Sequence, residues 1–235
     1  MKKLVWYQEL GFFNNPFSIK PAAFHNELMG LNQIIKEING KVEGSNIIFI
    51  SGEYGTGKTT VLKKIINEFE GKKQVIYYNC NQSEKSIDFD ELLTDMNWWR
   101  RLFGIRKKNM IILLDEVQDM NKKDIEQVKK YHEEGFFKSV ILVSKKEDME
   151  LTKELEEIIV ENKFELGNID KTDAVKMIRR RIGKLKFISD KNIIRIFNKN
   201  TNPRVFLRNC EDVCRYAFEN DSNEATEEHI KEVLG

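Results

Sequence analysis

The sequence predicts an α/β protein in which a parallel sheet, covered by helices, is followed by a small all-helical domain. Two patterns indicate this architecture. Short apolar runs alternate with helix-length amphipathic stretches as far as about Leu166, and beyond it the patterns are helical. Strands that alternate with helices form parallel sheets with helices on both faces. We therefore expect an α/β core in residues 1–166 and a helical domain in residues 167–235.

The expected core begins with an irregular, proline-punctuated segment and a helix near Glu27–Ile38, whose apolar residues recur at helical spacing. Four short apolar runs then predict buried strands: Asn46–Ser51, Gln74–Asn79, Met110–Leu114 and Ser139–Ser144. Between these runs, Thr59–Glu70 and Lys122–Glu133 are amphipathic and long enough to form covering helices.

Helix start signals recur through the second domain. Asp170 is a candidate cap for Thr172–Lys184, and Ser189 is a candidate cap for Asp190–Lys199. Asn202-Pro203 opens a helix that runs to about Glu219, and Thr226 starts the last one.

The composition limits the class of protein. The chain has 235 residues, 40% of them hydrophobic and 33% charged, with a net charge of +1. This apolar share can form a folded core, and the charge balance excludes a polycation that binds nucleic acid by bulk electrostatics. No apolar run approaches the ~20 residues of a membrane span, and three cysteines do not form a disulfide framework. We therefore expect a cytoplasmic protein without a membrane span.

A phosphate-binding loop is the strongest motif in the chain. The stretch Gly52-Glu53-Tyr54-Gly55-Thr56-Gly57-Lys58-Thr59, followed by Thr60, fits the pattern G-x-x-x-x-G-K-[ST] between a predicted strand and a predicted helix. The glycines let backbone N–H groups turn towards phosphate oxygens, and the helix adds its positive dipole end. Lys58 would reach the β- and γ-phosphates, and the Thr59 hydroxyl would bind Mg²⁺. We therefore expect a P-loop NTPase core that takes ATP and Mg²⁺.

Two carboxylates follow the third predicted strand. Met110–Leu114 leads directly into Asp115 and Glu116. In a P-loop fold, the strand next but one to the phosphate loop supplies an aspartate for Mg²⁺, here Asp115. Glu116 would then lie near the γ-phosphate and orient the attacking water. The alternative is an ordinary strand end that meets solvent, which the phosphate loop upstream argues against.

With these motifs, nearly the whole chain resembles the AAA+ ATPases. Residues Leu10–Ile19 contain a "GF…NPF" opening and Asp115–Met120 contain a "DE-x-Q" box, both similar to ExeA-type and transposition-helper ATPases. The strand that ends Tyr77-Tyr78-Asn79-Cys80 is more similar to archaeal origin-recognition ATPases. The helical tail looks like the AAA+ lid, and Asn202-Pro203-Arg204 looks like its sensor 2 motif.

The resemblance implies further roles by position. Ser144 stands where sensor 1 would contact the γ-phosphate or the water, and Asn79 matches the residue that holds the catalytic glutamate inactive in some relatives. Arg204 would project from the lid onto the phosphates. Phe17 and Ile19 would pack near the adenine. For Ser144 and Asn79, an ordinary polar strand end remains an alternative.

One departure from the family concerns the arginine finger that a neighbouring AAA+ subunit usually supplies. The sequence has no arginine between Arg106 and Arg179, and the stretch 151–163 is acidic. Lys153 or Lys163 could substitute, but an ammonium does not fork across two oxygens as a guanidinium does. We expect hydrolysis to be slow or dependent on a partner.

Two basic stretches are candidate interaction surfaces. Trp98–Lys108 combines aromatic and cationic side chains that suit duplex DNA or a docked partner, although these side chains could equally pack on the sheet. The run Lys176–Lys184 fits a solvated helix face or a phosphate-proximal surface. Cys210 and Cys214 lie one helical turn apart without a second ligand pair nearby, which favours core packing over metal binding.

These features favour an ATP-binding and ATP-hydrolysing molecular switch. It would act in a DNA transaction such as replication initiation or transposition, or assemble a partner complex or itself. The alternative is a non-catalytic scaffold, or a secretion-associated ATPase, that holds ATP or ADP and binds a protein partner. The missing arginine favours the scaffold, whereas the intact Lys58, Asp115 and Glu116 count against it. A small-molecule kinase is disfavoured, because such enzymes usually carry an arginine-rich lid.

Overall fold

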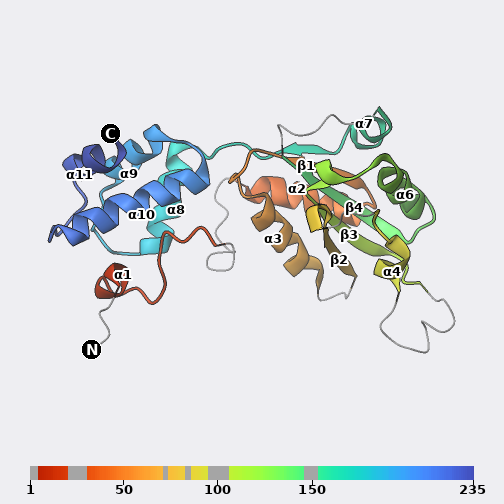
Figure 1. Ribbon diagram of the computed structural model, residues 1–235, viewed down its shortest axis with the longest axis horizontal. Helices are drawn as coiled ribbons and strands as arrows, with labels where there is room; N and C mark the ends of the chain where they lie inside the picture. The colour runs from red at the N-terminus through yellow and green to blue at the C-terminus, as the bar shows by residue number, and fades with distance from the viewer. Residues whose placement is uncertain (1–4, 21–30, 71–73, 83–85, 95–105, 146–152) are drawn as a thin grey trace. The chain divides into compact units, whose positions relative to one another are not determined.

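The computed structural model describes residues 5–20, 31–70, 74–82, 86–94, 106–145 and 153–235 (Figure 1). Contacts divide the chain into two compact units. One, here called the sheet unit, comprises residues 33–54 and 61–166, and the other, here called the helical unit, comprises residues 1–32, 55–60 and 167–235. Among the described residues, no helix combines the length and apolarity needed to cross a membrane.

A five-stranded sheet forms the centre of the sheet unit. Its strands are β1 (Ile47–Ser51), β2 (Val75–Asn79), β3 (Met110–Asp115), β4 (Phe137–Ser144) and β5 (Lys163–Glu165). Their order is β2-β3-β4-β1-β5, and every neighbouring pair is parallel. Because parallel strands present their carboxyl ends at one edge, the segments that follow β1, β2, β3 and β4 all begin there.

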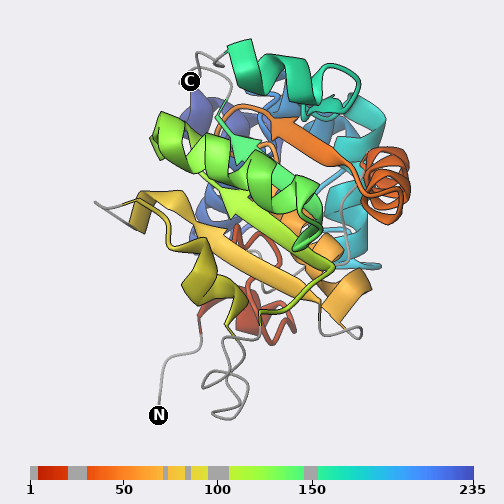
Figure 2. The same ribbon diagram turned by 90° about the vertical axis from the view of Figure 1, so that its right-hand side faces the viewer.

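Helices cover both faces of this sheet (Figures 1 and 2). They are α2 (Asn32–Glu43), α3 (Lys58–Glu70), α4 (Phe89–Leu93), α6 (Lys122–Glu133) and α7 (Lys153–Ile159), with short 3₁₀ turns η1 (Cys80–Gln82) and η2 (Val117–Asp119). Val140 shares a buried cluster with Phe89 of α4 and Val128 of α6. Ser139 points to the opposite face, where its hydroxyl donates to the Val42 carbonyl of α2 at 2.7 Å. Alternate residues of β4 therefore face different helices, which explains why the strand is buried along almost its whole length.

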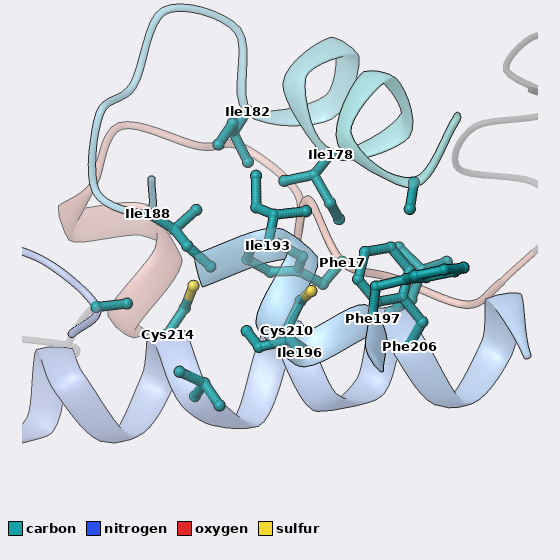
Figure 3. Close-up of a cluster of buried hydrophobic side chains, with 14 of the residues drawn as sticks. Phe17, Ile178, Ile182, Ile188, Ile193, Ile196, Phe197, Phe206, Cys210 and Cys214 are labelled. Atoms are coloured by element: carbon teal, nitrogen blue, oxygen red, sulfur yellow. The ribbon is translucent and has the colours of Figure 1, made fainter. Parts of the chain in front are cut away.

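The helical unit has its own hydrophobic core (Figure 3). Its helices are α1 (Trp6–Glu9), α8 (Lys171–Ile182), α9 (Asp190–Lys199), α10 (Pro203–Glu219) and α11 (Glu227–Leu234). Ile178, Ile193 and Phe206 meet in this core, and Phe17 of the N-terminal segment joins them. Cys210 and Cys214 are free thiols buried in the same cluster, as the sequence predicted.

Most of the expected elements agree with the structure. The four expected strands correspond to β1–β4 within two residues, and the expected Asp190–Lys199 helix coincides with α9. The α8 helix ends two residues before the expected Lys184, because Gly183 adopts a positive φ of 60° that terminates it.

The prediction of a helix near Glu27–Ile38 needs correction. Residues 27–30 lie outside the described residues, and α2 runs from Asn32 to Glu43, five residues beyond the expected end. Asn39-Gly40 resembles a stop signal. The helix continues through it because Val42 is completely buried on the next turn, so packing outweighs the local propensity.

The sequence reading also missed β5. This strand has only three residues, of which the first and last are exposed and the middle one is half-buried. It therefore lacks the apolar run that identified the other strands. It forms because β1 presents an unpaired edge, so that Leu166 N–H donates to the Ser51 carbonyl at 2.7 Å.

Candidate functional site

The phosphate loop connects β1 to α3. Gly55 and Gly57 have φ values of +92° and +102°, a left-handed conformation that side chains with a Cβ avoid, so the glycines are required for this turn. Lys58 begins α3, and the Thr60 N–H donates to the Gly57 carbonyl at 2.9 Å. The N–H groups of the first turn and the positive end of the helix dipole favour anion binding at such a helix start.

The strand register brings the other expected polar residues to the edge where this loop starts. Asn79 of β2 is paired with Asp115 of β3, and Ser51 of β1 is paired with Ser144 of β4. Since β4 lies between β3 and β1, Asp115 comes from the strand next but one to the phosphate loop. The carboxyl edge of a parallel sheet is the usual location of ligand sites in such folds.

Asp115 is held in place by two neighbours. Its side chain is buried, the Tyr77 hydroxyl donates to Oδ2 at 3.0 Å, and the Glu116 N–H donates to Oδ1 at 3.0 Å. Burial, followed by the Asp115 charge, raises the pKa of Tyr77 to about 12, so the phenol remains a donor at neutral pH. Sequence reasoning missed Tyr77. The available signal was its position two residues before Asn79, on the same face of β2.

Glu116 adopts a left-handed backbone conformation, with φ 58° and ψ 44°, which turns the chain sharply into η2. Its Oε2 atom lies 2.5 Å from Gln118 Nε2 and 3.4 Å from Lys145 Nζ. The Gln118 Oε1 atom accepts a hydrogen bond from the Ser144 hydroxyl at 2.9 Å. The sequence placed Glu116 and Ser144 at this edge, but gave Gln118 and Lys145 no role.

The expected partner of Glu116 was Asn79. In the structure, the Asn79 Oδ1 atom accepts the Asn81 N–H at 3.0 Å. Among the described residues, Glu116 contacts Gln118 and Lys145 through side chains. A role for Asn79 in restraining the glutamate therefore stays a prediction.

Arg204 is the second residue of α10. Asn202 caps this helix by accepting the Arg204 N–H at 3.1 Å, and Pro203 occupies the first helical position. The expected adenine segment is also in the helical unit, where Phe17 is buried in the core and stacks on Trp6 at 6.1 Å between ring centroids. An adenine contact at Phe17 or Ile19 stays a prediction, and the burial of Phe17 leaves the half-buried Ile19 as the better placed of the two side chains.

The expected basic patch at Trp98–Lys108 lies mostly outside the described residues, since only residues 106–108 of it are described. Arg106 pairs with Asp90 at 2.8 Å, and its guanidinium carbon lies 5.7 Å from the Phe136 ring centroid. The Lys108 amine lies 5.5 Å from the same centroid. These cations therefore make local packing contacts.

The second basic run also makes structural contacts. Arg179 donates to Asp190 at 2.6 Å and to the Ile188 carbonyl at 2.7 Å. Arg181 donates to the Ser18 carbonyl at 3.0 Å and to the Pro16 carbonyl at 3.3 Å. These two half-buried arginines connect segments of the helical unit, so they are not part of the solvated helix face that was one expectation for this run.

The sheet order, the phosphate loop after β1 and the acidic pair after β3 define a P-loop NTPase core, followed by a helical region. A sequence model described as the AAA domain matches residues 44–166, about half of the chain. The chain therefore belongs to the AAA family of P-loop proteins, as the resemblance predicted. No curated protein matches the sequence.

Solved structures with a similar fold include those of Cdc6p, RuvB and ORC proteins. Cdc6p from Pyrobaculum aerophilum superimposes with a TM-score of 0.68 at 14% identity, over 92% of this chain and 70% of that one. A RuvB variant from Thermotoga maritima gives 0.66 at 16% identity, over 92% and 72%. Drosophila ORC bound to DNA gives 0.64 at 12% identity, over 95% and 66%. The chain thus spans about two thirds of these proteins, and at such identities the likeness concerns the fold alone.

Proposed function

We propose that the protein is an ATP-binding and ATP-hydrolysing switch of the AAA+ type. The observation that carries the proposal is a common edge of the sheet. The phosphate loop begins at this edge, β3 ends there with Asp115 and is followed by Glu116, and β4 ends there with Ser144. ATP would bind through Gly52–Thr60, with Mg²⁺ held by Thr59 and Asp115. The chemistry supplied by the metal is neutralisation of charge on the β- and γ-phosphates.

The residues of the chain would divide the remaining work. Lys58 neutralises the phosphate charge that develops during transfer, and Glu116 orients the water for in-line attack on the γ-phosphate. Ser144 donates to a γ-phosphate oxygen, and Arg204 approaches the phosphates from the lid. In this proposal the nucleotide changes the relation between the core, residues 1–166, and the lid, residues 167–235, and thereby the contacts with a partner.

We further propose that this partner is duplex DNA or a complex that assembles on it. The structures with a similar fold include one bound to DNA, which supports this choice of partner at the level of the fold. The region Trp98–Lys108 is the candidate contact. A protein partner, or an arginine from elsewhere in a second copy of this chain, would supply the cation that the stretch between Arg106 and Arg179 lacks.

The first experiment measures ATP hydrolysis per subunit against protein concentration, with and without duplex DNA. We expect the rate to rise with concentration or with DNA, because an intersubunit or partner-supplied cation can raise the rate about 10³-fold. Lys58→Ala should abolish nucleotide binding, whereas Glu116→Gln should retain ATP and hydrolyse it about 100-fold more slowly. Lys63→Ala, on the same helix α3, is the matched control and should behave as the wild type.

A nucleotide-bound scaffold is the second candidate, favoured by the missing arginine. It predicts bound nucleotide and a rate near zero under every condition, and an assembly state that Glu116→Gln does not change. That combination would contradict the proposed hydrolytic switch.

A further inference from the structure

A connected cluster of polar side chains lies where β3 and β4 end in the sheet unit. Gln118 is at its centre, because its Nε2 atom is 2.5 Å from Glu116 Oε2 and its Oε1 atom is 2.9 Å from the Ser144 hydroxyl. Lys145 adds an ion pair to the same carboxylate oxygen at 3.4 Å. One amide thus connects the proposed water-orienting glutamate to the proposed phosphate-sensing serine.

The chemistry of the groups fixes the direction of these hydrogen bonds. An ionised carboxylate only accepts, so the Gln118 NH₂ group must face Glu116. The Gln118 carbonyl then faces Ser144, and the Ser144 hydroxyl must be the donor. This hydroxyl has a single proton, which Gln118 Oε1 shares with the Lys145 carbonyl 3.1 Å away. Ser144 is 1% exposed, so water does not compete with these acceptors.

A γ-phosphate oxygen that accepts from Ser144 would compete for the same proton. The proton can point fully to one acceptor only, so a strong bond to phosphate weakens the bond to Gln118. Gln118 would then lose one of the two contacts that fix its amide. The Glu116 carboxylate would be the first group affected, since Gln118 Nε2, at 2.5 Å, is the nearest side-chain donor to it among the described residues.

We propose that Gln118 is a positioning residue that orients the Glu116 carboxylate and couples it to the presence of a γ-phosphate at Ser144. This inference rests on the proposed ATPase function and adds to it a residue to which no role was assigned from the sequence. The role that the family resemblance gave to Asn79 stays a separate prediction, since the Asn79 Oδ1 atom accepts the Asn81 N–H in this structure.

A double-mutant cycle on nucleotide binding tests the coupling without requiring hydrolysis. The proteins are the wild type, Gln118→Met, Ser144→Ala and the double variant, and the probes are Mg²⁺–β,γ-imido-ATP and Mg²⁺–ADP. Gln118→Met keeps the length of the side chain but removes the competing acceptor. It should raise the affinity for imido-ATP relative to ADP about fivefold, which is the change in affinity that one net hydrogen bond typically produces. The gain should disappear in the Ser144→Ala background, because the donor is then absent.

The positioning role has a separate kinetic readout. In Gln118→Met the kcat for ATP should fall about tenfold while KM stays level or falls, because the orientation of Glu116 is lost but the phosphate contacts are kept. A purely structural role would raise KM and lower thermal stability together. The control is Gln33→Met, which removes a Gln–Glu hydrogen bond of 3.1 Å to Glu37 on α2 and should change neither affinity nor kcat.

Each outcome is decisive. An unchanged imido-ATP to ADP ratio in Gln118→Met, or an equal gain with and without Ser144, overturns the coupling. An unchanged kcat overturns the positioning role. A wild type that binds both nucleotides but hydrolyses no ATP would contradict the proposed function, while the binding cycle still decides the coupling. A wild type that binds neither nucleotide overturns both.

Discussion

At the scale of single residues, Asp115 depends on a neighbour that the sequence did not single out. The Tyr77 hydroxyl donates to Oδ2, the oxygen opposite the one that accepts the Glu116 N–H. Groups that hydrogen-bond a metal ligand orient it, and their loss typically weakens metal affinity about 10–100-fold. Tyr77 is therefore the residue most directly able to tune the proposed Mg²⁺ site.

Tyr77→Phe should raise the Mg²⁺ concentration for half-maximal hydrolysis about tenfold, since Asp115 loses the donor that orients it. The assay is a magnesium titration of ATP hydrolysis at saturating ATP. Tyr78→Phe, on the next position of β2 and facing the other side of the sheet, is the control and should leave the titration unchanged. Identical titrations for both variants would contradict an orienting role for Tyr77.

The same tyrosine predicts a pH dependence of stability. Its pKa is raised from the ordinary value of 10.0 to about 12 in the folded protein, so the stabilisation is complete below pH 10 and is lost as the pH rises towards 12. The difference in thermal unfolding temperature between the wild type and Tyr77→Phe should therefore narrow from pH 9 to pH 12. A difference that stays constant over this range would show that the Tyr77 proton is not linked to folding.

At the scale of single elements, the N-cap residue of α9 contributes to the stability of the helical unit. Ser189 accepts the Asn192 N–H at 3.2 Å, and the helix buries Ile193, Ile196 and Phe197. Ser189→Ala should destabilise the protein by about 1 kcal/mol, because the first turn loses an acceptor. Urea unfolding measures this value. Ser189→Asp restores an acceptor and should recover most of the loss, whereas equal losses in both variants would exclude capping as the cause.

At the scale of the whole molecule, the proposed switch requires that nucleotide change the relation between core and lid. Arg204→Ala should still bind ATP but should lose the change in radius of gyration that nucleotide produces in the wild type, because the lid no longer contacts the phosphates. Small-angle scattering with imido-ATP and with ADP measures this change. Arg208→Ala lies one turn along α10 and serves as the control. The switch mechanism fails if the wild type itself shows no nucleotide-dependent change.

Much of the fold could be predicted because its signals are local. Buried parallel strands are continuous apolar runs, and helix caps such as Ser189 and Asn202 are visible as single residues before amphipathic stretches. The phosphate loop is also local, since eight consecutive residues contain its glycines, lysine and threonine. The full length of α2 and the presence of β5 are examples of what could not be predicted this way. The α2 helix passes through Asn39-Gly40 because of packing, and β5 forms only because β1 offers an edge.

The sequence by itself determined the α/β core, the helical region after Leu166, the phosphate loop and the acidic pair at the end of β3. Only the tertiary structure decided which side chains surround that pair. Tyr77 of β2 and Lys145 after β4 meet Asp115 and Glu116 because parallel pairing places the ends of β2, β3 and β4 side by side. Residue spacing along the chain cannot encode such contacts, because they depend on strand order and register.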